Sequence, residues 1–294
     1  MPKRILGIDE NGLGPLMGPL IVTGTLLKYG KKDAGWFDDI ADSKSFFSTR
    51  TSGNYSKMEE TAISVFYLAN KRMPISPGEL LDVFCGGVKC LSGMNICNGN
   101  IPEQFVWADP EKAKKRCDEF SGWASKNGVE IERVRSFCLC PSRINNFVQK
   151  RATKLLLDFL TFCSIIKEIP EKKGLEVQAG KIGGLKFYRS YLLYNFPDYS
   201  PVTLDEREEL SSYSLKNGRT DFRMNFIMDV EKKSFPAALS SITGKYIREL
   251  FMESIRRTLN IKEDISGYHD KKTLQRIASL NTKDFPSACL FRRK

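Results

Sequence analysis

Histidine is almost absent from this chain, which contains only His269 among its 294 residues. That scarcity argues against hydrolytic triads built on a Ser/His pair, and a single histidine cannot supply the two that an HExxH zinc site needs. Any hydrolytic chemistry in this protein would therefore depend on carboxylates. Carboxylates acting together with Mg²⁺ are the simplest arrangement, because hard divalent cations prefer oxygen ligands.

The chain also lacks CxxC pairs and long apolar runs. Its eight cysteines are irregularly spaced, which favours free thiols in an intracellular protein, with a zinc site at Cys85, Cys90 and Cys97 as a minor alternative. No stretch approaches 18 apolar residues, and Asp9 and Glu10 interrupt the apolar run that follows the basic start. We therefore expect no membrane span, no signal peptide and a cytoplasmic location.

Acidic residues are fewer than basic ones. The chain contains 46 Lys and Arg against 35 Asp and Glu, a formal net charge of +11 with a pI near 9.2. This excess favours a polyanionic partner such as nucleic acid, although a basic protein without such a partner is the alternative. With 41% hydrophobic residues, the chain is long enough for one large domain or two small ones.

Apolar patterning alternates between the periods of strands and of helices. It predicts strands at 129–140, 175–179, 222–228 and twice within 4–30, and helices at 54–70, 142–167, 234–259 and up to about 195 after the glycines at 183 and 184. Proline and glycine make 71–128 look irregular, apart from a short helix at 109–120. The alternation predicts an α/β or α+β chain built on a mixed sheet, with no internal repeat.

The first twenty residues hold the most informative motif. An apolar run at 5–8 reads as a buried strand, Asp9 and Glu10 follow at once, and Gly12 and Gly14 begin a Gly/Pro turn. Two carboxylates at the end of a buried strand repel each other and lose hydration, and a divalent cation relieves both costs. Glycines in the turn allow the backbone to approach a ligand closely. An ordinary hairpin with an acidic tip is the alternative.

Three motifs, in order along the chain, resemble those of type 2 ribonucleases H, the ribonucleases HII and HIII. Residues 7–19, Gly-Ile-Asp-Glu-Asn-Gly-Leu-Gly-Pro-Leu-Met-Gly-Pro, resemble the opening motif of that family, and the Asp-Ser-Lys of 42–44 resembles the next. Residues 231–249, an acid followed by a helix with Ser-Ile and Lys-Tyr-Ile-Arg-Glu, resemble the third. Residues 71–128 match nothing typical of the family, so we expect an insertion there, within a single ribonuclease H-like domain over 1–294.

The resemblance implies a ribonuclease H-like α/β fold, with a mixed central sheet flanked by helices. It also implies endonucleolytic hydrolysis of the RNA strand in RNA–DNA hybrids, with two Mg²⁺ or Mn²⁺ ions held by carboxylates. By motif, Asp9, Glu10 and Glu231 are the implied metal ligands and catalytic residues, and Glu at position 231 is the choice typical of ribonuclease HIII. Glu249 matches an acid near the site, although an ion pair with Lys245 is an equally good interpretation.

The resemblance also implies contacts with the nucleic acid. The matching positions are Gly12, Gly14, Ser43, Lys44, Lys245 and Arg248. Basic side chains near phosphates position a duplex without reading its sequence, and glycine amides can reach the 2′-hydroxyls that distinguish RNA from DNA. For each lysine taken singly, a solvated surface position is the alternative.

Two positions depart from the family pattern. The family carries a further metal-binding Asp on a middle strand, and residues 176–184 align Gly180 with it. Either the chain is inactive or another acid supplies the ligand, such as Asp229, which lies two residues from Glu231 and would share one side of an extended strand with it. Leu13 replaces the Arg with which ribonuclease HII reads a ribonucleotide junction, so cleavage at single ribonucleotides is not expected.

The sequence therefore predicts a metal-dependent ribonuclease H of type 2, with activity impaired by the glycine at position 180. A catalytically inactive protein of the same fold that binds RNA–DNA hybrids is the alternative. A metal nuclease of this fold acting on DNA is a weaker third possibility.

Overall fold

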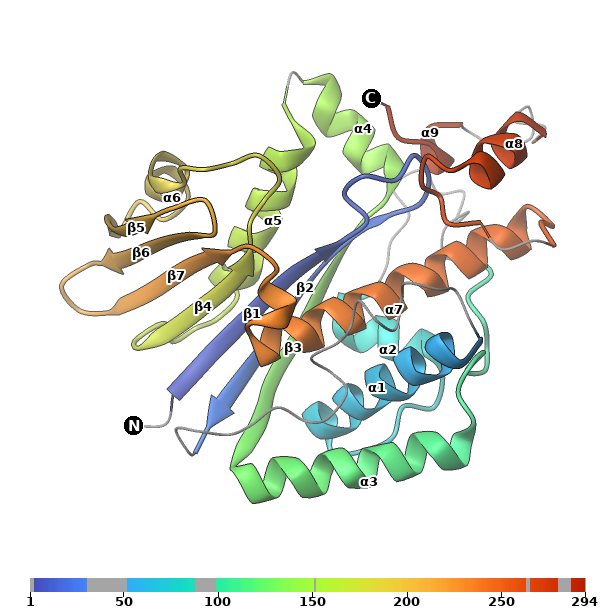
Figure 1. Ribbon diagram of the computed structural model, residues 1–294, viewed down its shortest axis with the longest axis horizontal. Coiled ribbons are helices and arrows are strands. Elements are labelled where there is room, and N and C mark those ends of the chain that lie inside the picture. Colours follow the sequence, from blue (N-terminus) through green and yellow to red (C-terminus); the bar gives the residue numbers. More distant parts are fainter. Residues whose placement is uncertain are drawn as a thin grey trace.

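A seven-stranded mixed sheet with helices on both faces forms the described part of this protein (Figure 1). The computed structural model describes residues 3–30, 52–87, 99–150, 152–262, 265–279 and 287–293. The α/β class with a mixed central sheet flanked by helices, predicted from the sequence, is confirmed. The strands are β1 (Lys3–Asn11), β2 (Leu20–Tyr29), β3 (Val129–Leu139), β4 (Leu175–Gly180), β5 (Ser200–Glu206), β6 (Leu210–Lys216) and β7 (Asp221–Ile227). The helices are α1 (Ser52–Asn70), α2 (Pro77–Cys85), α3 (Pro110–Asn127), α4 (Pro141–Gln149), α5 (Lys154–Lys167), α6 (Arg189–Asn195), the 3₁₀ turn η3 (Val230–Lys232), α7 (Phe235–Thr258), α8 (Lys271–Ser279) and α9 (Ser287–Leu290).

Strand order places β1 and β4 at the centre of the sheet, in the order β3-β2-β1-β4-β7-β6-β5. β1 pairs in parallel with β4, and β4 pairs in parallel with β7, whereas the outer pairs are antiparallel. Ile8 is opposite Ala179, and Gly180 is opposite Ile227. The carboxyl ends of the three parallel strands therefore meet at one edge of the sheet, where ligands of α/β proteins usually bind.

Two apolar layers cover the sheet. Helices α1, α2, α3 and α7 pack on one face, whereas α4, α5 and α6 pack on the other (Figure 1). α7 lies directly on β1, since a Cβ added to Gly7 would come within 2.1 Å of the Ala237 backbone nitrogen. Only glycine permits this close approach. The approach brings the start of α7 beside the end of β1.

Two sequence predictions about helices need correction. The single helix predicted at 142–167 is two helices, and α5 begins afresh because Thr153 Oγ1 accepts a hydrogen bond from the Leu156 amide at 3.1 Å. The stretch 71–128 is not irregular throughout, because it contains α2 and α3. α3 is longer than predicted, since Asp109 caps its first turn and Gly128 ends it in the left-handed conformation. That 71–128 is an insertion stays a prediction.

Strands β5 and β6 were not predicted. β6 is rich in serine, but its pairing with β7 buries Ser211 and Tyr213 on the sheet. Within the described ranges, no helix is both long and apolar enough to cross a membrane. The six cysteines that the structure describes are free thiols, and Cys90 and Cys97 lie outside the described residues.

Candidate active site

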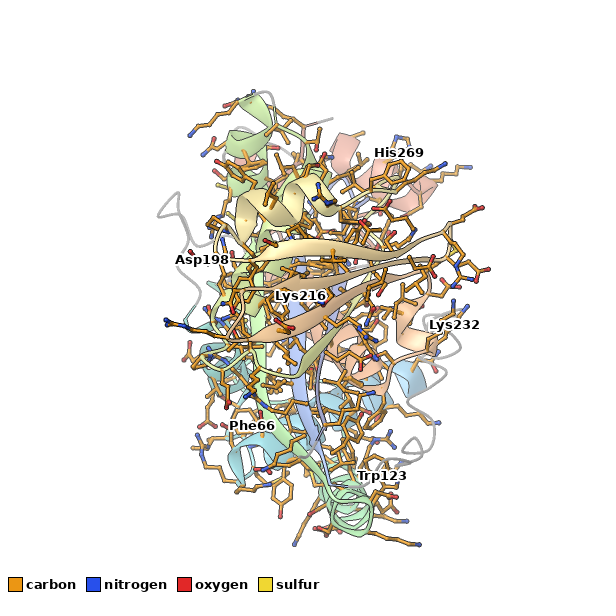
Figure 2. The ribbon with its side chains drawn as sticks, turned by 90° about the vertical axis from the view of Figure 1, so that its left-hand side faces the viewer. Phe66, Trp123, Asp198, Lys216, Lys232 and His269 are labelled. Atoms are coloured by element: carbon orange, nitrogen blue, oxygen red, sulfur yellow. The ribbon has the colours of Figure 1, made fainter. Side chains whose placement is uncertain are left out.

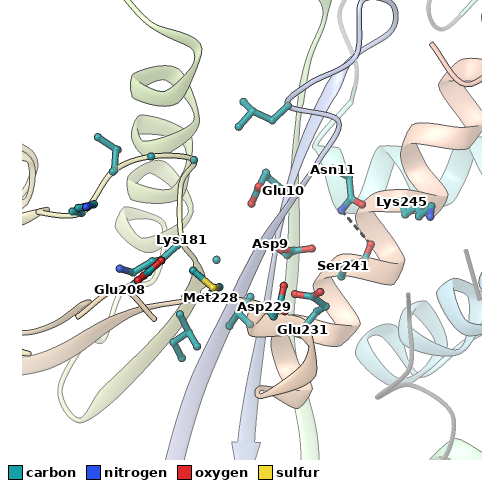
Figure 3. A pocket seen from close by; sticks show the side chains of 18 residues that line it. Asp9, Glu10, Asn11, Lys181, Glu208, Met228, Asp229, Glu231, Ser241 and Lys245 are labelled. Atoms are coloured by element: carbon teal, nitrogen blue, oxygen red, sulfur yellow. Dashed lines mark hydrogen bonds between the residues drawn. The ribbon is translucent and has the colours of Figure 1, made fainter. Parts of the chain in front are cut away.

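A cavity of about 920 Å³ opens at the edge where β1, β4 and β7 end (Figure 3). Its walls bring together segments from β1, the turns after β4 and β7, and the first half of α7. Asp9, Glu10, Gly180, Glu231 and Lys245 all line it. The structure thus gathers in one place five of the residues that the sequence motifs single out.

The strand pleat separates the two acids of the N-terminal motif. Leu6 and Ile8 point into the apolar layer that contains α5, so Glu10 is on the same side. Asp9 alternates with Glu10 and shares the side of Gly7, which faces α7. The end of β1 therefore presents one carboxylate toward each helical layer (Figure 3).

Glu231 reaches the cavity from a tight turn instead of an extended strand. β7 ends at Ile227, Asp229 has a left-handed backbone with φ 51°, and η3 then carries Glu231, whose side chain is buried. Asp229 also lines the cavity, but it is partly exposed and pairs with Lys232 at 3.1 Å. The prediction that Asp229 and Glu231 share one side of an extended strand is therefore wrong.

Buried acidic groups near the end of β1 affect one another's ionisation. Burial raises the pKa of Glu10 well above its ordinary value, and the charges of Asp158, Asp9 and Glu231 raise it further. Burial and the charge of Asp9 also raise the pKa of Asp158. Asp158, on α5, is a residue that the sequence analysis missed. Its signal was a single acid in the apolar run Leu-Leu-Leu-Asp-Phe-Leu.

The donor set of this site fits a hard divalent cation in its chemistry, since every donor is a carboxylate oxygen. No three acids, histidines or cysteines of the described chain already stand close enough together to hold an ion. A cation bound here would have to draw the carboxylates closer together than they stand in this structure.

Gly180 stands where a side chain would meet the acid pair. A Cβ added there would lie 3.3 Å from Glu10 Oε2 and 3.4 Å from Asp9 Oδ1. Those neighbours are the ends of flexible side chains, so a larger residue needs only a small shift. The position therefore matches the strand-end placement that the sequence alignment gave it.

Arg248 and Glu249 are on α7 and do not line the cavity. They form a buried ion pair at 3.3 Å, and Tyr55 donates a hydrogen bond to Glu249 at 3.5 Å. Arg248 also donates to the Ser266 carbonyl at 2.9 Å, and its Nε would be 2.6 Å from a Cβ on Gly12, whose φ is +90°. These contacts brace the glycine turn, and the burial of Arg248 argues against a direct phosphate contact.

The end of the chain holds the glycine turn in place. Arg292, which is buried, donates to the carbonyls of Gly12, Leu13 and Gly18, and its own amide donates to Leu16 O at 2.8 Å. This clamp was not predicted from the sequence. Gly14, in contrast, has no atom within 4 Å of an added Cβ among the described residues, so its backbone faces open space.

Ser43 and Lys44 are outside the described residues. Asn11 is next to the acid pair and donates to the Ser241 carbonyl of α7 at 3.2 Å (Figure 3). His269 is exposed just before α8 (Figure 2).

Comparison with solved structures identifies proteins of similar fold. Ribonuclease HII of Archaeoglobus fulgidus, solved in a complex with PCNA, has 15% identity and a TM-score of 0.51, and the match covers 98% of this chain and 94% of that one. Ribonuclease H2 of Pyrococcus horikoshii OT3 has 13% identity and the same TM-score, with 98% and 92% covered. At these identities the likeness establishes the fold. This chain has the fold of a type 2 ribonuclease H over nearly its whole length.

A more distant match is Bst-RNase HIII in complex with Mn²⁺, with 11% identity and a TM-score of 0.44, covering 99% of this chain and 66% of that one. This similarity is too low to carry an argument. Neither the known protein-family models nor the curated protein sequences give a match to this chain.

Metal-free protein is expected to lose stability as the pH rises. The raised pKa values of Glu10 and Asp158 mean that the folded state keeps protons which the unfolded state releases above about pH 4. Their contribution to stability is complete below that pH and is lost as the pH passes through the raised folded values. Urea unfolding midpoints in EDTA, from about pH 4 to 8, measure this loss. Asp158→Asn removes one of the two groups and should flatten the curve, whereas parallel curves for the two proteins would contradict the expectation.

Proposed function

We propose that this protein is a divalent-metal-dependent endonuclease that hydrolyses the RNA strand of RNA–DNA hybrids. The observation that carries the proposal is the convergence of Asp9, Glu10 and Glu231 on one cavity of a type 2 ribonuclease H fold. The positive net charge and the cytoplasmic location predicted from the sequence are consistent with a nucleic-acid substrate.

Each group at the cavity has a task in this proposal. Asp9, Glu10 and Glu231 would hold Mg²⁺ or Mn²⁺, two ions in the active complex. When bound, these ions supply Lewis-acid stabilisation of the charge that develops at the scissile phosphate. Lys245 lines the same cavity and offsets phosphate charge. The open backbone at Gly14 allows close approach to the RNA minor groove.

A catalytically inactive hybrid-binding protein is the second candidate, and one observation favours it. Gly180 offers no carboxylate at the strand end beside Asp9 and Glu10. A site with one ligand fewer would hold the second ion weakly, and the fold and the basic residues would still bind a hybrid.

One assay separates the candidates. The protein is incubated with an end-labelled RNA–DNA hybrid and with double-stranded DNA of the same sequence, in Mg²⁺ and separately in Mn²⁺. Metal-dependent cutting of the RNA strand supports the proposal. Retention of the uncut hybrid in a binding assay supports the inactive alternative. Cutting of the DNA duplex would overturn both in favour of a DNA nuclease.

Hybrid binding is expected to weaken steeply with salt. Each neutralised phosphate releases counterions, with a log–log slope of about −0.9 per contact on B-form duplex. Lys245→Gln should reduce the slope by about one contact. Lys216→Gln, at the far end of β6 (Figure 2), is the matched control and should leave the slope unchanged. Fluorescence anisotropy over a salt series measures both, and a flat affinity would exclude a phosphate-dominated partner.

Leu13 predicts a preference for runs of ribonucleotides. Its side chain lines the cavity and packs on the apolar layer beneath, and it cannot hydrogen-bond to a ribonucleotide junction. Cleavage of a continuous RNA strand should therefore be faster than cleavage of DNA with a single embedded ribonucleotide. Equal or faster cutting at the lone ribonucleotide in a parallel time course would contradict this interpretation of Leu13.

A further inference from the structure

Two fully buried carboxylates of this chain have opposite surroundings. Glu59, on α1, accepts hydrogen bonds from the amides of Val106, Trp107 and Ala108 and from the Tyr246 hydroxyl. Asp158, on α5, has no hydrogen-bond partner for either Oδ atom among the described residues. Both side chains are 0% exposed. A buried polar group without partners is costly, so a retained one calls for a specific explanation.

The position of Asp158 supplies that explanation. α5 packs beneath the sheet on the side toward which Glu10 points, and the neighbours of Asp158 in sequence, Leu157 and Phe159, belong to the apolar layer there. The charge of Asp158 acts on Glu10, and that of Asp9 acts on Asp158. Asp158 is therefore a buried, unpartnered carboxylate in the helical layer toward which Glu10 points.

We propose that Asp158 is a fourth carboxylate of the metal site, beside Asp9, Glu10 and Glu231, supplied by α5 in place of the strand-end position that Gly180 leaves without a side chain. The inference rests on the proposed function and names a ligand for the same ions. In this proposal the carboxylate comes from the helix under the sheet instead of from the end of β4. A divalent cation bound between Asp158 and the acid pair is the partner that both Oδ atoms lack.

A structural role would look different. Asp158 caps no helix and forms no ion pair within the described parts of the chain, and Glu59 shows how this fold satisfies a structural carboxylate. The absence of such partners predicts that the metal-free protein tolerates loss of Asp158. Replacing an isolated buried acid with an apolar residue commonly stabilises a protein, and gains of this kind at functional sites come with lost function.

The test measures metal binding and stability without reference to cleavage. Asp158→Asn and Asp158→Leu are compared with the parent by calorimetric titration with MnCl₂ and by thermal unfolding in EDTA and in MnCl₂. We expect the affinity for Mn²⁺ to fall at least about 10–100-fold, because removing even a group that only supports a metal ligand costs this much. We also expect Asp158→Leu to unfold in EDTA at a temperature no lower than the parent, and to gain less from Mn²⁺.

Glu59→Gln is the matched control. It should lower the unfolding temperature in EDTA and leave the affinity for Mn²⁺ unchanged, because Glu59 is hydrogen-bonded on the opposite face of the sheet. Unchanged Mn²⁺ affinity in both Asp158 variants would overturn the proposal, as would destabilisation in EDTA comparable with that of Glu59→Gln. If Asp9→Asn abolishes Mn²⁺ binding while the Asp158 variants do not, only this inference fails. If Asp9→Asn also leaves Mn²⁺ binding intact, the proposed function fails with it.

Discussion

Asp9→Asn is expected to abolish metal-dependent cleavage of an RNA–DNA hybrid, with a loss of at least about 10²–10³-fold, the range typical of removing one electrostatic stabiliser from an active site. Asn preserves the shape of the side chain but removes its charge, at the place where β1 ends between Glu10 and Glu231 (Figure 3). Single-turnover cleavage in Mg²⁺ and in Mn²⁺ measures the loss. Titration calorimetry should show weaker metal binding in the same variant.

The matched control for that variant is Asp198→Asn. Asp198 is exposed and lies on another side of the molecule (Figure 2). Asp198→Asn removes the same charge from the protein as Asp9→Asn does, so a change in hybrid binding that both variants show is due to net charge. Cleavage and metal affinity should be those of the parent. If Asp9→Asn bound metal as tightly as the control does, Asp9 could not be a ligand.

Gly180→Asp in the Asp158→Asn background is expected to raise hybrid cleavage about 10²-fold or more, because it returns a carboxylate to a site that lacks one. The new side chain fits, since the contacts of an added Cβ tighter than 3.5 Å are with the flexible ends of Glu10 and Asp9, and Val230 is at an ordinary 3.7 Å. In the parent background the gain should stay below about tenfold, because Asp158 already contributes its charge. Steady-state rates for the four combinations form a double-mutant cycle that isolates this coupling.

Gly184→Asp controls for added charge alone. Gly184 lines the same cavity, and a Cβ there meets nothing within 4 Å among the described residues, so an acid is accommodated away from the acid pair. This variant should not raise the cleavage rate.

Gly180→Asp should also destabilise the metal-free protein while increasing its stabilisation by Mn²⁺, because the added acid repels its neighbours until a cation binds. Additive rates across the cycle would show that positions 158 and 180 do not serve the same ion.

Local patterns predicted the sheet well where a strand carries its own signal. β1, β2, β3, β4 and β7 follow the apolar runs closely. β5 and β6 were missed because serine-rich alternation resembles a loop until a neighbouring strand buries it. The break between α4 and α5 depends on the Thr153 cap, a weak signal inside a continuous apolar pattern. Residue propensity and apolar periodicity therefore predicted the strands that carry a local signal. β5 and β6 can be recognised only from their pairing with neighbouring strands.

The sequence by itself predicted the acid pair at the end of the first strand, the acid before the last long helix, and a glycine at a strand end between them. Those features are contiguous motifs, and a strand-end acid is recognisable from its neighbours. Only the tertiary structure showed the buried, unpartnered state of Asp158 and the contacts of Arg292 and Arg248. Asp158 is buried because α5 packs on the sheet, and Arg292 reaches the glycine turn because residues 287–293 fold back over it. Contacts between distant segments depend on how buried surfaces fit together, and no local period in the sequence encodes that fit.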